Sequence, residues 1–74
     1  MTFTLKQNND TRNIWFAWTD SKKIAGSVMF MVDAYYTDIW TGRDYSEPKG
    51  PYPSMDVAVD ALLADYVAFV LEQA

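Results

Sequence analysis

Alternating apolar and polar residues predict strands in the first part of the chain. The stretch TFTLKQ at residues 2–7 alternates, and the turn-forming run NND follows it, which predicts a short edge strand. The stretch NIWFAW at residues 13–18 is almost wholly apolar and is followed by turn residues, which predicts a central strand. Its alternation would place Ile14, Phe16 and Trp18 on one face and Trp15 and Ala17 on the other.

Residues 22–41 fit two patterns. Apolar residues recur there at helical spacing, so a helix is one interpretation. Gly26 and the many Val, Phe, Tyr, Ile, Thr and Trp residues favour strands instead, and the preceding turn residues suit a hairpin. We predict two strands, about Ile24 to Met31 and about Tyr35 to Thr41, with a reversal near Asp33, and keep the helix as the alternative.

A loop and a helix are predicted to follow. Residues 42–54 contain all three prolines and two of the three glycines, which predicts a loop that ends the sheet. Ser54 can act as N-cap of a helix from about Met55 to about Glu72, and Asp56 would lie in its first turn, where the helix dipole favours negative charge. The apolar arc expected to pack on the sheet comprises Met55, Ala58, Val59, Leu62, Leu63, Tyr66, Phe69 and Val70.

These elements predict an α+β fold in a single domain over residues 1–74. A small antiparallel β-sheet of three to four strands would lie mostly within residues 1–49, and residues 50–74 would form a loop and one C-terminal amphipathic α-helix that packs on the sheet. The length leaves room for one core only. Aromatic residues make up 16% of the chain, and we expect most of them, including the three tryptophans, to fill that core.

The charge distribution is uneven along the chain. The formal net charge is -4, yet residues 1–49 carry six basic and six acidic side chains and are neutral. The whole imbalance therefore belongs to the last third, which contains no Lys or Arg. Its acidic residues would form the outer face of the helix, and they are Asp56, Asp60, Asp65 and Glu72.

The composition excludes several kinds of function. The chain has no His and no Cys, so the usual general base, the Ser-His nucleophile pair and thiolate metal sites are all missing, and we expect no enzyme activity, no metal and no cofactor. The remaining acids, such as Asp33, Asp38 and Asp44, are expected to be solvated surface groups rather than a catalytic pair. The acidic balance argues against direct nucleic-acid binding.

The location of the protein is predicted from what the chain lacks. Residues 1–7 have no basic segment followed by an apolar core, and apolar runs such as Val28 to Val32 are much shorter than the roughly 20 residues that cross a bilayer. We expect a cytoplasmic protein with no membrane contact.

A short antiparallel sheet followed by the segment GPYPSMDVAVDAL at residues 50–62 resembles, in the order of its elements, the small orphan proteins of phages and other mobile elements, with anti-CRISPR and related host-defence inhibitors among them. The resemblance implies a non-enzymatic inhibitor that binds a host protein. The hypothesis is that the acidic helix face, Asp56, Asp60, Asp65 and Glu72, occludes a basic surface of that partner. The alternative is a homodimeric accessory or structural module that associates through exposed sheet aromatics and through Val57, Val67 and Leu71.

Overall fold

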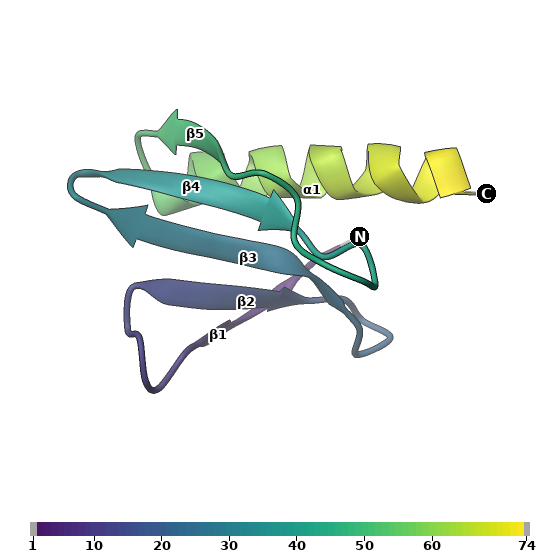
Figure 1. The fold of residues 1–74 in the computed structure, drawn as a ribbon, viewed down its shortest axis with the longest axis horizontal. Coiled ribbons are helices and arrows are strands. Elements are labelled where there is room, and N and C mark those ends of the chain that lie inside the picture. Colours follow the sequence, from purple (N-terminus) through teal and green to yellow (C-terminus); the bar gives the residue numbers. More distant parts are fainter. Residues whose placement is uncertain (1, 74) are drawn as a thin grey trace.

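The computed structural model describes residues 2–73 as a sheet of five strands and one helix (Figure 1). In chain order the elements are β1 (Thr4–Gln7), β2 (Ile14–Trp18), β3 (Ile24–Met31), β4 (Ala34–Ile39), β5 (Lys49–Tyr52) and α1 (Met55–Gln73). The α+β class and the single C-terminal helix are therefore confirmed.

The strands form one antiparallel sheet in the order β1-β2-β3-β4-β5, so each strand pairs with its neighbour in the chain. The prediction of three to four strands is wrong, because β5 lies within the segment expected to be a loop. It contains Gly50 and Pro51, and glycine and proline are typical of turns, so the sequence predicted a loop here. A proline is nevertheless tolerated on an edge strand, where one side of the backbone needs no partner, and β5 is the edge strand beside β4.

Residues 22–41 form two strands, as predicted, and not a helix. The chain reverses at Val32 and Asp33, since Met31 pairs with Ala34 across the hairpin. Gly26 is buried, and a Cβ atom at this position would collide with the backbone carbonyl of Asp38 on β4. The glycine is therefore needed for the close approach of β3 and β4.

Helix α1 covers one face of the sheet and packs across β3, β4 and β5. Ser54 caps its start as predicted, because the Ser54 Oγ accepts the N–H of Val57 at 3.2 Å. The buried core joins helix and sheet and comprises Ala17, Ala25, Val28, Ala58 and Leu62. Phe3, just before β1, meets Tyr66 of α1 edge to face with ring centroids 5.9 Å apart, so the start of the chain also reaches the helix.

The C-terminal turns of α1 project past the ends of β3 and β4 (Figure 1). Val70 was expected inside the apolar arc, but it is 41% exposed, because no strand lies beneath this part of the helix. Val67 and Leu71 are exposed there as well, Leu71 by 69%. Within the part of the chain that the structure describes, no helix is both long and apolar enough to cross a membrane.

Candidate functional site

Two acidic residues at the start of α1, Asp56 and Asp60, have no Lys or Arg partner among residues 2–73. Asp56 and Asp60 are both exposed and lie about one turn, roughly 5.4 Å, apart along the helix axis. Within residues 2–73 neither carboxylate is within ion-pair distance of a Lys or Arg side chain. Val57 lies next to Asp56 in the chain and is 43% exposed. These three residues, Asp56, Val57 and Asp60, form what we call the acidic helix face.

The other two predicted acidic residues lie in different surroundings. Asp65 is only partly exposed, and its Oδ2 is 3.4 Å from the Nζ of Lys49, so its charge is compensated. The placement of Asp65 on an unpaired outer face is therefore wrong, because β5 brings Lys49 beside the helix. Glu72 is exposed in the last turn, about 18 Å along the axis from Asp60. The four carboxylates do not form one cluster.

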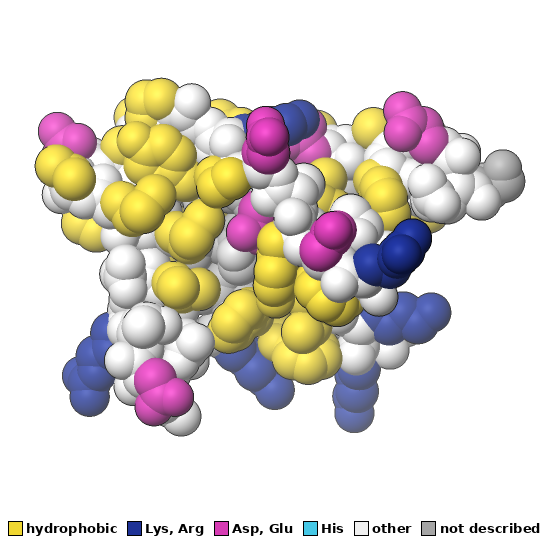
Figure 2. Space-filling model, viewed as in Figure 1, with side chains coloured by type: hydrophobic (Ala, Val, Ile, Leu, Met, Phe, Trp, Pro, Cys, Tyr) yellow, Lys and Arg dark blue, Asp and Glu magenta, His cyan; other side chains and the backbone are white. Residues whose placement is uncertain are grey.

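The face of the sheet opposite α1 is not covered by another element, and hydrophobic side chains occupy much of it (Figure 2). Most Lys and Arg side chains in this view lie along the side of β1 and β2, away from the helix. Strand alternation places Phe16 on this open face, because its neighbour Ala17 belongs to the core. None of the three tryptophans is buried, so the expectation that they fill the core is wrong.

Asp38 is buried on the same open side, although it was expected to be a solvated surface acid. It is 8% exposed, and its Oδ1 accepts the Ser27 hydroxyl at 2.6 Å and the Ser27 N–H at 3.0 Å. Burial raises the pKa of Asp38, while the two bonds from Ser27 act to lower it. Burial and the charge of Asp38 also raise the pKa of the Tyr45 hydroxyl. Tyr45 packs on Trp40 with ring centroids 4.8 Å apart.

Ser27 is the residue whose hydrogen bonds Asp38 accepts, and Tyr45 is the neighbouring titratable group that its charge affects. Among residues 2–73, no three residues of the His, Cys, Asp or Glu types come together as a group that could hold a metal ion. Ser27 and Asp38 are register partners on β3 and β4, so their hydrogen bonds join these two strands.

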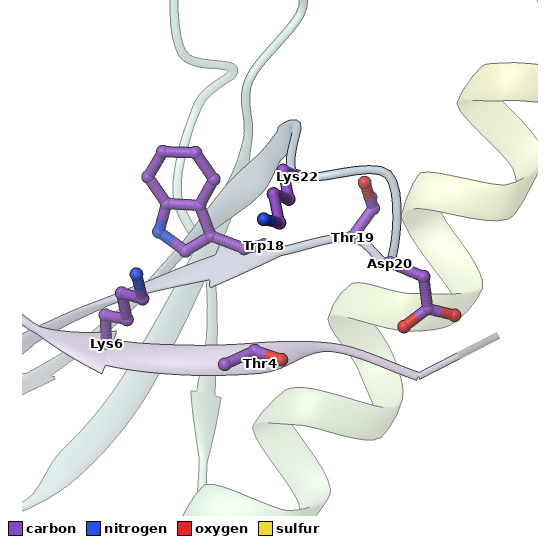
Figure 3. Close-up of a pocket in the computed structure, with 6 residues that line it drawn as sticks. All are labelled: Thr4, Lys6, Trp18, Thr19, Asp20 and Lys22. Atoms are coloured by element: carbon purple, nitrogen blue, oxygen red, sulfur yellow. The ribbon is translucent and has the colours of Figure 1, made fainter.

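A first hollow of about 380 Å³ lies at the β1 edge of the sheet (Figure 3). The Nζ of Lys6 is 5.6 Å from the centre of the Trp18 ring, and Figure 3 shows both side chains on the same side of the strands. Lys22 and Asp20 also line this hollow, so it presents two cationic side chains and one carboxylate.

A second hollow of about 400 Å³ is lined by residues at the ends of β2 and β4, at the start of β3 and on α1. We call it the aromatic hollow, and its lining residues are Trp18, Lys23, Ile24, Trp40, Thr41, Gly42, Tyr66 and Phe69. The sequence did not indicate it, because its walls come from three strands or their turns and from the helix. The periodic positions of Trp18 and Phe69 show only that each lies in a regular element, and Trp40 lies just after β4.

No protein-family model, no curated protein and no solved structure matches this chain.

Proposed function

We propose that the protein is a non-enzymatic binding module that docks its acidic helix face onto a basic surface of a larger protein. The observation that carries the proposal is the pair of exposed carboxylates, Asp56 and Asp60, which stand one turn apart beside exposed Val57 without a cation from residues 2–73 to compensate them. Carboxylates beside an apolar side chain match a partner surface that has both a cationic rim and an apolar centre.

The proposal rests on two of the four carboxylates considered from the sequence, Asp56 and Asp60. Asp65 is compensated by Lys49, and Glu72 belongs to the other end of the helix. Two carboxylates one turn apart can form ion pairs with two basic side chains of a partner. In a nucleic-acid-binding protein such side chains would otherwise contact phosphates, so a nucleic-acid-binding surface is the proposed target. Binding there would exclude the nucleic acid. Such occlusion agrees with the inhibitor role that the resemblance to small phage proteins implies.

The test is a comparison of two double variants that change the net charge equally. Asp56→Asn with Asp60→Asn removes the charges of the acidic helix face, while Asp10→Asn with Asp33→Asn removes two exposed charges elsewhere. Proteins captured from a lysate of the source cells are quantified for the wild type and for both variants. We expect the captured amount of one partner to fall about tenfold or more with the helix variant. The captured amount of the same partner should stay unchanged with the control variant.

Equal thermal unfolding curves of the two double variants show that any loss of capture comes from the surface and not from the fold. A captured set that stays the same in both variants, or that falls equally in both, would contradict binding through Asp56 and Asp60. A partner whose retention does not weaken as salt is added would also contradict it, because pairing between exposed charges is screened by salt.

A further inference from the structure

The projecting end of α1 carries exposed apolar side chains beside the aromatic hollow. Leu71 is 69% exposed, Val70 41% and Val67 38%, and we call these three residues the helix knob. Tyr66 and Phe69, from the same turns of the helix, line the hollow. Exposed apolar side chains and an apolar recess therefore share the same turns of α1.

The lining of the hollow is of the kind found at the centres of protein interfaces. Two tryptophans, a tyrosine and a phenylalanine contribute to its walls, and Trp and Tyr are enriched among the residues that dominate binding energy. Its volume of about 400 Å³ is enough to admit side chains, and these walls would contact them from several sides.

The charges around the two features are complementary. Lys23 lines the hollow, and Glu72 follows Leu71 directly in the chain. Neither side chain forms an ion pair within residues 2–73. A helix knob that entered the hollow of another molecule would therefore bring a carboxylate toward an ammonium group at the rim, where opposite charges favour the correct orientation.

We propose that a second copy of this chain occupies the aromatic hollow, with each copy inserting Leu71 of its helix knob into the hollow of the other. One chain carries both complementary features at the same end, and a two-fold axis between two such ends satisfies both contacts at once. This isologous arrangement closes, so association stops at a dimer.

The proposed dimer leaves the acidic helix face free. Leu71 is about 16 Å along the helix axis from Asp60, so the two surfaces belong to opposite halves of α1. Self-association and binding of a basic partner are thus separate properties, and each has its own variants.

The first test is sedimentation of the wild type across a dilution series. We expect a reversible monomer–dimer equilibrium, with a shift in Trp fluorescence as Trp18 and Trp40 change their exposure to water. Leu71→Lys should raise the dissociation constant at least about tenfold, because it places an ammonium group in the apolar recess. Met31→Lys is the matched control, because Met31 is an exposed apolar residue at the β3–β4 hairpin outside both proposed surfaces, and it should leave the dimer unchanged.

The second test exchanges the charges across the interface. Lys23→Glu and Glu72→Lys should each weaken the dimer several-fold, and the double variant should restore it, because the pair is then reversed and not lost. All these side chains are exposed, so the folded monomer is expected to persist.

Several outcomes would overturn the proposal. One is a wild type that stays monomeric at every concentration. Others are a dimer that forms equally well with Leu71→Lys, a dimer lost equally with Met31→Lys, and a double charge exchange that fails to restore association.

Discussion

Val32 adopts a backbone conformation that its side chain does not favour. It lies at the β3–β4 turn with φ of 61° and is 95% exposed, so no packing compensates the crowding of its branched Cβ in the left-handed region. Val32→Gly should stabilise the protein by about 0.5–1 kcal/mol and raise the melting temperature by several degrees. Thermal unfolding measures the change.

The control is the neighbouring turn residue, Asp33, which is not among the residues with positive φ. Asp33→Gly gains no relief of strain and increases the freedom of the unfolded chain, so it should lower the melting temperature. A gain from Asp33→Gly as large as that from Val32→Gly would show that left-handed strain at Val32 is not the cause.

Asp38 gives the stability a specific dependence on pH. Its pKa is raised in the folded protein, mainly by burial, so the folded state binds a proton more tightly than the unfolded state does. The cost of burying the charge is complete above the raised pKa. Protonation removes this free-energy cost as the pH falls through the raised pKa of Asp38 toward the ordinary carboxyl pKa. Asp38 therefore adds stability on mild acidification.

Asp38→Asn isolates this effect, because an amide has no charge to lose and its oxygen can still accept the bonds from Ser27. Urea unfolding at neutral and at mildly acidic pH should show that the wild type gains stability relative to the variant as the pH falls. The reverse trend would mean that the Ser27 bonds to the carboxylate outweigh the effect of burial.

At the scale of the element, α1 depends on Leu62. Leu62 is fully buried between the helix and the sheet, and truncation to Ala typically costs about 2–5 kcal/mol in a core. Since small domains have total stabilities near the low end of about 5–15 kcal/mol, Leu62→Ala should unfold a measurable fraction at moderate temperature. Ala64→Ser on the exposed side should change the stability by less than about 0.5 kcal/mol. Thermal melts that rank these two variants in the opposite order would contradict the observed orientation of α1.

The elements that the sequence predicted well are those whose signals are local. Strand β3 and the start of α1 follow from β-favouring composition and from the Ser54 cap, and both were placed correctly. Strand β5 was missed because its pairing with β4 is a tertiary contact, whereas Gly50 and Pro51 are local signals for a turn. The ion pair of Lys49 with Asp65 was missed for the same reason.

At the scale of the molecule, the sequence located the net negative charge but not its effective distribution. Six basic and six acidic residues cancel along residues 1–49, yet Lys49 in fact compensates a helix carboxylate and most other cations gather beside β1 and β2 (Figure 2). The aromatic hollow depends on the offset of α1 relative to the strand ends. That offset is set by the packing of Leu62 and Ala58 into the sheet, which no periodicity along the chain contains.

The order of the strands also has a consequence for how the chain folds. Because every strand pairs with its neighbour in the chain, each ladder closes over a short connection, and the entropy lost at each step is small. Such local topology favours fast folding, with little searching among wrong strand pairings. The contact between Phe3 and Tyr66 joins residues far apart in the sequence, so we expect it to form after the transition state and to influence the unfolding rate more than the folding rate.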